Sequence, residues 1–226
     1  MAIFTISLNQ LVEASVSTSN AKTRIVKQQL VVNRILIMWY RLAKKKLKEY
    51  FIDVRNIKVL NDALAEIKKL PEEKKNAARD KQVSLEAIQK VINMKFDKIL
   101  IYGYEILKIK DTSLELDDIR VTINPDLIFR YIEDGVVKIG ALKYHVSKTK
   151  PFDLQQSRLI ANLIKQLLEE KVANKDEVVD EKLCWSYDVF AERLLHADKD
   201  ANISNSEIKN LCIELKTIFK SLNNSL

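Results

Sequence analysis

An aspartate and a lysine in the middle of the chain are of types that could act together on a phosphate. Asp126 follows Asn124 and Pro125 in a β-rich apolar stretch, and Lys143 lies in the next such stretch. A carboxylate can hold a divalent cation, and a lysine can polarise a phosphate or an attacking nucleophile. The alternative interpretation is that Pro125 and Asp126 only end a strand and that Lys143 is a solvated side chain.

A β-hairpin over residues 119–147 would bring these two side chains together. Two runs rich in β-branched and aromatic residues flank a turn at residues 133–135, the pattern of a hairpin with a glycine-containing loop. Because side chains alternate between the faces of a strand, Lys143 and His145 share one face of the second strand. The sequence therefore predicts that Lys143 and Asp126 converge.

This arrangement resembles the core of the PD-(D/E)XK nuclease superfamily over roughly residues 84–190. The resemblance lies in a Pro-Asp on one strand, a strand carrying a lysine, an amphipathic helix and a further strand. It implies that Asp126 holds Mg²⁺ and that Lys143 assists the attack of water on a phosphodiester. The second metal-binding acid of that superfamily falls on Ala141, which cannot bind a metal.

Three alternatives address the missing acid. Glu86, on the preceding helix, or Glu105, on the first strand, could supply the carboxylate, or His145 could supply a nitrogen ligand, although nitrogen suits a softer metal than Mg²⁺. Otherwise the site is inactive and only the scaffold remains. The predicted function is a nucleic-acid-acting protein similar to Mg²⁺-dependent nucleases. The alternative is an inactive nuclease-like scaffold that binds nucleic acid or assembles with a protein.

Positive charge is concentrated at the start of the chain. Residues 1–50 hold nine Lys/Arg and two Asp/Glu, a net charge of +7, and residues 51–226 sum to zero. A basic surface of this kind attracts phosphate backbones, so the run Lys44, Lys45, Lys46 and Lys48 is a candidate nucleic-acid contact, with DNA favoured over RNA. The alternative is a solubilising helix face.

Composition indicates an ordered protein with a substantial core. Of its 226 residues 47% are hydrophobic, and it has only three glycines and three prolines. Cys184 and Cys212 lie in apolar segments and are expected to be buried thiols. We find no secretory signal, and the most apolar window, residues 30–40, is too short to span a bilayer. The sequence thus predicts a cytoplasmic protein without a membrane partner.

Apolar periodicity and breaker residues predict the remaining elements. We expect helices at residues 22–29, 29–51, 56–70 and from Ser84, a solvated segment at 72–82, and a strand at 98–110. Residues 111–118 are expected to be a polar turn. After the hairpin we expect a helix capped by Asp153 and Gln156, an acidic loop at 171–182, and a strand at 183–190.

The predicted fold class is α/β, with a small mixed sheet of about four strands in α-β-β-β-α-β order, as in restriction endonucleases. A basic helical region, residues 1–82, would precede a core, residues 83–226. A helix beginning near Ser204 carries an apolar stripe and would close that core, or would bind a second subunit or a protein partner.

Overall fold

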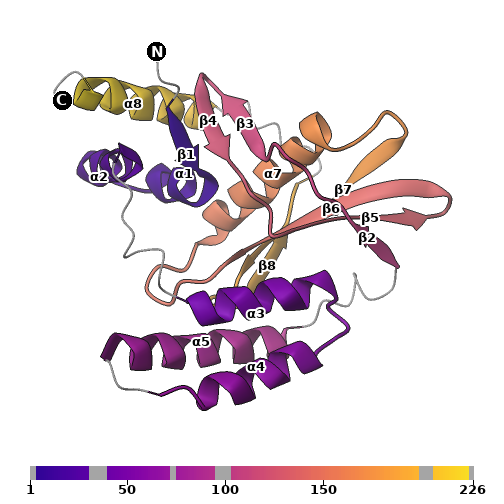
Figure 1. The fold of residues 1–226 in the computed structure, drawn as a ribbon. Coiled ribbons are helices and arrows are strands. Elements are labelled where there is room, and N and C mark those ends of the chain that lie inside the picture. Colours follow the sequence, from indigo (N-terminus) through magenta and orange to yellow (C-terminus); the bar gives the residue numbers. More distant parts are fainter. Residues whose placement is uncertain (1–3, 31–39, 72–74, 95–102, 199–205, 224–226) are drawn as a thin grey trace.

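The computed structural model describes residues 4–30, 40–71, 75–94, 103–198 and 206–223. Within these ranges the chain has a mixed α/β fold (Figure 1). The helices are α1 (Leu8–Ser15), α2 (Ser19–Leu30), α3 (Arg41–Ile52), α4 (Lys58–Lys68), α5 (Lys75–Asn93), α7 (Leu154–Lys171) and α8 (Ser206–Asn223). The strands are β1 (Thr5–Ser7), β2 (Tyr104–Ile106), β3 (Ser113–Leu116), β4 (Ile119–Thr122), β5 (Leu127–Glu133), β6 (Val136–His145), β7 (Glu177–Asp188) and β8 (Arg193–His196).

The larger sheet has the strand order β2-β5-β6-β7-β8. All its neighbouring strands are antiparallel except β6 and β7, which are parallel and are connected by α7. The predicted hairpin is confirmed for β5 and β6, with Glu133 paired to Val136. Its two turn residues, Asp134 and Gly135, both have positive φ, as a two-residue turn of type I′ requires.

A smaller sheet of order β1-β4-β3 was not predicted. Residues 119–122 were expected to lead directly into the hairpin, but they form β4 and pair with β1 and β3 instead. The left-handed conformation of Asn124, with φ of 46°, followed by Pro125, separates β4 from β5. Residues 111–118 are also not only a turn, because β3 lies within them and buries Leu114.

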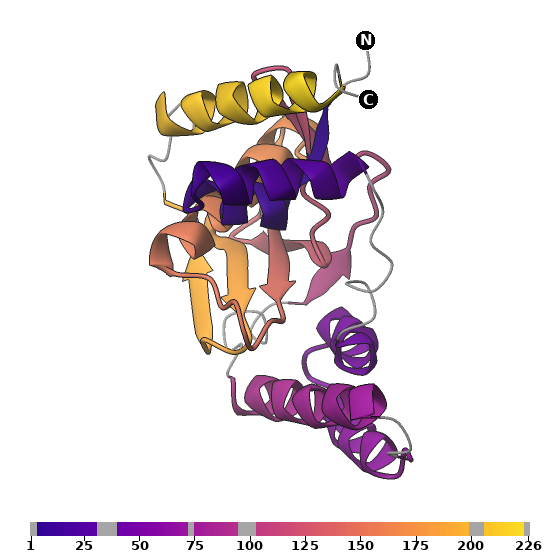
Figure 2. The same cartoon turned by 90° about the vertical axis from the view of Figure 1, so that its left-hand side faces the viewer.

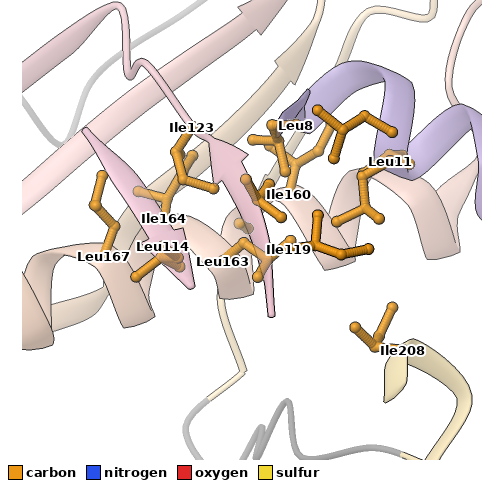
Figure 3. Packing of buried hydrophobic residues seen from close by; sticks show 14 of the residues in the cluster. Leu8, Leu11, Leu114, Ile119, Ile123, Ile160, Leu163, Ile164, Leu167 and Ile208 are labelled. Atoms are coloured by element: carbon orange, nitrogen blue, oxygen red, sulfur yellow. The ribbon is translucent and has the colours of Figure 1, made fainter. Parts of the chain in front are cut away.

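The five-stranded sheet is covered on both faces (Figure 1). One face packs against α3, α4 and α5 through buried side chains that include Phe51, Ile88, Phe129, Leu142, Tyr144, Trp185 and Tyr187. The other face packs against α7 and the smaller sheet, where a second set of apolar side chains gathers (Figure 3). That set includes Leu11, Leu114, Ile128, Ala141, Ile160, Ile164 and Cys184.

The C-terminal helix α8 packs on the core of its own chain, which is one of the two predicted alternatives. Its apolar stripe, including Leu211, Cys212 and Leu215, is buried with α1 and α2. Lys22 Nζ lies 2.7 Å from Glu214 Oε2, and the rings of Phe4 and Phe219 stack 4.7 Å apart. The two ends of the chain therefore lie at the same end of the molecule (Figure 2). The predicted cap Ser204 lies outside the described residues.

Several predicted boundaries are wrong for identifiable reasons. A helix over residues 29–51 cannot continue through Tyr40, whose φ is 60°, and α3 begins at Arg41. Residues 31–39 of that prediction lie outside the described ranges. Residues from Lys75 onward are helical, because lysine, alanine and arginine favour helix even where they are exposed. The predicted domain boundary between residues 82 and 83 falls within α5 and stays a prediction.

In the second half of the chain, the expected loop at 171–182 is partly strand. Glu177 to Lys182 extend β7 beside β6, and the short strand β8 follows it. Only Tyr104–Ile106 of the predicted strand at 98–110 is described as a strand, and residues 98–102 lie outside the described ranges. No helix among the described residues is long and apolar enough to cross a membrane.

The close approach of β6 and β7 at Gly140 gives a test of this packing. A Cβ at Gly140 would lie 2.7 Å from Phe129 Cζ and 2.8 Å from both Leu183 Cβ and the Leu183 carbonyl oxygen. We expect Gly140→Ala to lower the free energy of unfolding by about 1–3 kcal/mol, measured by urea denaturation. Gly103→Ala, where a Cβ meets nothing within 4 Å, is the control. Equal urea midpoints for the two variants would contradict this close packing of Gly140 against Phe129 and Leu183.

Candidate functional site

Asp126 and Lys143 meet at the open end of the β5–β6 hairpin, as the sequence predicted. The backbone N–H of Asp126 donates to the Leu142 carbonyl over 2.8 Å, which fixes Asp126 beside β6. Lys143 Nζ lies 3.3 Å from Asp126 Oδ2 and donates to the Asn124 carbonyl over 2.6 Å. The Tyr144 backbone N–H donates to the same carboxylate oxygen over 3.0 Å. The Oδ2 oxygen of Asp126 therefore already accepts from two donors.

The Asp126–Lys143 pair is largely enclosed by protein. The two side chains are 21% and 14% exposed. Burial raises the pKa of Asp126 above its ordinary value, and the charge of Lys143 together with the Tyr144 N–H acts in the opposite direction. The carboxylate is thus held in place by its neighbours, as in an internal ion pair.

Neither alternative carboxylate is directed at Asp126. Glu86, on α5, has its Oε2 2.6 Å from Lys148 Nζ. Glu105, on β2, has its Oε2 2.8 Å from Arg130 Nε, and the hydrogen bond from Arg130 lowers the pKa of Glu105. In the sheet register Glu105 lies opposite Arg130, four residues along from Asp126, or about 13 Å at the rise of a strand. The carboxylates of Glu86 and Glu105 therefore pair with Lys148 and Arg130 and do not complete a metal site at Asp126.

His145 is also committed to another contact. Its Nε2 lies 2.9 Å from the Lys150 carbonyl oxygen, and because a carbonyl only accepts, Nε2 carries the proton. The ring stacks on Phe152 with centroids 3.8 Å apart, and burial lowers the pKa of His145. A protonated Nε2 cannot bind a metal ion, so Nδ1 is the one ring nitrogen of His145 that could.

The residues present do not fit Mg²⁺. Ala141, at the position of the second acid, is fully buried in the core beneath α7. Among the residues that the structure describes, no group of three or more His, Cys, Asp or Glu side chains could hold a metal ion. Mg²⁺ is usually bound by one or two carboxylates together with several waters, and the carboxylate available here, that of Asp126, already pairs with Lys143 and accepts from the Tyr144 N–H.

A groove with a volume of about 1040 Å³ lies beside this pair. The helices α1 and α2 form one wall, α3 and α5 form the other (Figure 2), and the loop after β6 forms the floor. Of the described residues that line it, five are basic and one is acidic, a net charge of +4 with His145 neutral. The charged residues are Glu13, Arg24, Lys44, Arg79, Lys148 and Lys150. We call this the basic groove.

The predicted lysine run contributes one side chain to the basic groove. Lys44 is an exposed residue that lines it, and burial of its ammonium group by the surrounding protein lowers the pKa of Lys44. The charges of Asp126 and Lys143 also act on Lys44, so the groove adjoins the ion pair. Lys46 instead lies 2.9 Å from Glu66 Oε2, because the helix directs neighbouring residues to different sides.

The other two lysines of the run, Lys45 and Lys48, are exposed outside the groove. The remaining cations of the groove were not predicted. Arg24, Arg79, Lys148 and Lys150 come from three separate segments, and no spacing in the sequence relates those segments. Only the packing of α2, α5 and the loop after β6 brings them together.

The floor of the groove is attached to both walls. Lys150 forms an ion pair with Glu13 on α1, and Lys148 forms one with Glu86 on α5. The Lys148 backbone N–H also donates to the Tyr40 hydroxyl over 2.8 Å. These contacts hold the loop in place, and they also occupy two of the five cations.

Comparison of the sequence with models of known protein families and with curated protein sequences finds no match.

The ion pair can be tested through its dependence on pH. Lys143→Met would leave the Asp126 carboxylate without its cation, and we expect a loss of about 3 kcal/mol in the free energy of unfolding at neutral pH. In the folded variant the pKa of Asp126 would rise further above its value in the unfolded chain. Between these two pKa values the folded state binds more protons, so stability falls as pH rises through that window and returns as pH decreases.

Urea denaturation across a pH series measures this effect. The double variant Asp126→Asn, Lys143→Met removes both charges and serves as the control, which we expect to recover most of the stability. A deficit in Lys143→Met that does not change with pH would show that the pair is not an internal ion pair.

Proposed function

We propose that this protein binds nucleic acid in the basic groove, on a scaffold similar to that of PD-(D/E)XK nucleases, without hydrolysing it. The observation that carries this proposal is the convergence of five basic side chains from four segments of the chain on one groove. A groove lined by one sign of charge attracts a polyanion and releases the counterions condensed on it. DNA stays the favoured ligand, with RNA as the alternative.

The order of elements supports the scaffold. The helix α5 is followed by the antiparallel strands β2, β5 and β6, by α7, and by β7 parallel to β6. With the hairpin of β3 and β4 counted as an insertion, this succession is compatible with the α-β-β-β-α-β order expected from the sequence. The basic groove adjoins the open end of β5 and β6, where the superfamily places its site.

The second candidate is a Mg²⁺-dependent nuclease. The contact between Lys143 and Asp126 favours it, because these are the two residue types that such a site requires at these positions. The buried Ala141 and the engaged carboxylates of Glu86 and Glu105 oppose it. We therefore assign Asp126 and Lys143 a structural role in holding the strand ends.

Binding can be measured by fluorescence anisotropy with short labelled oligonucleotides at several salt concentrations. We expect affinity to fall linearly with the logarithm of the salt concentration. The double variant Arg24→Gln, Lys44→Gln should bind at least tenfold more weakly and lower the slope by roughly two, since each phosphate contact contributes about 0.9. The double variant Lys45→Gln, Lys48→Gln changes the net charge equally outside the groove and is the matched control.

An equal loss in both double variants would show that the net charge, and not the groove, causes binding. Absence of binding by the wild-type protein would contradict the proposal.

Catalysis needs a separate test. We expect no cleavage of plasmid DNA, single-stranded DNA or RNA by the wild-type protein with Mg²⁺ or Mn²⁺, and retained binding by Asp126→Ala and Lys143→Ala variants that circular dichroism shows to be folded. Metal-dependent cleavage that both variants lose would instead establish the nuclease.

The acidic residue of the basic groove, Glu13, should weaken the binding of nucleic acid. Glu13 pairs with Lys150 and is the one carboxylate among the described lining residues. We expect Glu13→Gln to bind an oligonucleotide up to about fivefold more tightly at low salt, because an exposed ion pair stabilises by at most about 1 kcal/mol. Glu49→Gln, which removes the same charge from a residue beside Lys46 on α3, is the control. If both variants bind the oligonucleotide more tightly by the same factor, the gain in affinity comes from net charge and not from the position of Glu13 in the groove.

A further inference from the structure

The two walls of the basic groove differ in chemistry. The wall formed by α1 and α2 presents the carboxamides of Asn9, Gln10 and Gln28 beside the apolar Val16 and Ile25. The opposite wall presents Lys44 and Arg79, and the floor adds Lys148 and Lys150. Two of the five cations lie on the wall of α3 and α5 and two lie on the floor. The wall of α1 and α2, which we call the amide wall, carries the three carboxamides, one cation, Arg24, and the acid Glu13, which pairs with Lys150.

Carboxamides and cations prefer different parts of a nucleic acid. A carboxamide carries both a donor and an acceptor, which match the paired donors and acceptors along the edge of a base. Lysine and arginine favour phosphate oxygens. Gln10 Oε1 already accepts from the Ser7 hydroxyl over 2.7 Å, so the NH₂ group is the part of the Gln10 carboxamide left for a base.

The one cation of the amide wall is consistent with this division. Arg24 lies on α2, close along the helix to Ile25 and Gln28. A guanidinium plane can stack on an unpaired base as well as bind a phosphate.

A duplex and a single strand would present different groups to the groove. The bases of a duplex are paired with each other, so a duplex would present mainly phosphates and would leave the carboxamides of Gln10 and Gln28 unused. An unpaired strand can offer its base edges to them.

We infer that the basic groove binds a single strand of nucleic acid, with its bases toward the amide wall of α1 and α2 and its phosphates toward the cations of α3, α5 and the floor. This inference rests on the proposed function and specifies its ligand. Both walls contribute, because the cations give affinity without base preference, and the amides give base preference with little affinity. A single strand of DNA and one of RNA share this chemistry.

The experiment compares labelled oligonucleotides of one sequence as single-stranded DNA, single-stranded RNA and duplex DNA, together with homopolymers of each base. We expect the wild-type protein to bind one or both single strands at least tenfold more tightly than the duplex, and to prefer some homopolymers over others. Comparison of single-stranded DNA with single-stranded RNA shows whether the groove prefers deoxyribose or ribose.

Two variants separate the walls. Gln10→Ala, Gln28→Ala should reduce the preference among homopolymers severalfold and leave the salt slope unchanged. Lys44→Gln should lower the salt slope by roughly one and leave the preference unchanged. Gln89→Ala, an exposed glutamine on α5 outside the groove, is the matched control for the amides.

Failure of this inference can be distinguished from failure of the proposed function. Duplex binding as tight as single-strand binding, or an unchanged homopolymer preference in Gln10→Ala, Gln28→Ala, would overturn this inference while nucleic-acid binding in the groove still held. If no nucleic acid binds at all, both the proposed function and this inference are wrong.

Discussion

The register of the β5–β6 hairpin determines where the residues of the site lie. The two-residue turn at Asp134 and Gly135 pairs Leu127 with Leu142, and the N–H of Asp126 then reaches the Leu142 carbonyl. A slip of one residue would exchange the two faces of β6. Such a slip would turn Lys143 toward the core of α3 and α5, where an unpaired ammonium group is costly. The hairpin register and the Asp126–Lys143 ion pair therefore support each other.

The end of the same strand positions the floor of the basic groove. His145 pairs with Asp188 across β6 and β7, and Asp188 is fully buried. Its carboxylate accepts hydrogen bonds from the backbone N–H groups of Phe152, over 2.6 Å, and Ala191, over 2.9 Å. The loop between His145 and Phe152 is thus fixed at both ends, so Lys148 and Lys150 project from a supported segment.

The distribution of charge in the fold differs from its distribution along the chain. The whole excess of +7 lies in residues 1–50, yet of the groove's described cations only Arg24 and Lys44 come from there. Arg79, Lys148 and Lys150 come from residues 51–226, which have no net charge as a whole. Some acids of this part of the chain lie away from the groove, as Glu105 does at the β2 edge. A part of the chain without net charge can therefore contribute a basic surface once folding separates its charges.

The sequence by itself determined the local features of this protein. The Asp-Gly turn, the capping box of Asp153 and Gln156, the apolar stripe of α7 and the convergence of Asp126 with Lys143 all follow from interactions between residues close in sequence or paired across one hairpin. Each depends on backbone geometry or periodicity, which a short window of sequence contains. The mixed α/β class followed from the same signals.

Only the tertiary structure decided the rest. The parallel pairing of β1 with β4, the second sheet, and the neutralisation of Glu86 and Glu105 by Lys148 and Arg130 join residues far apart in the chain. Many partners of suitable charge exist in a chain that is 31% charged, so sequence alone cannot choose among them. The basic groove belongs to the same class, since its walls are adjacent only because both pack around one sheet.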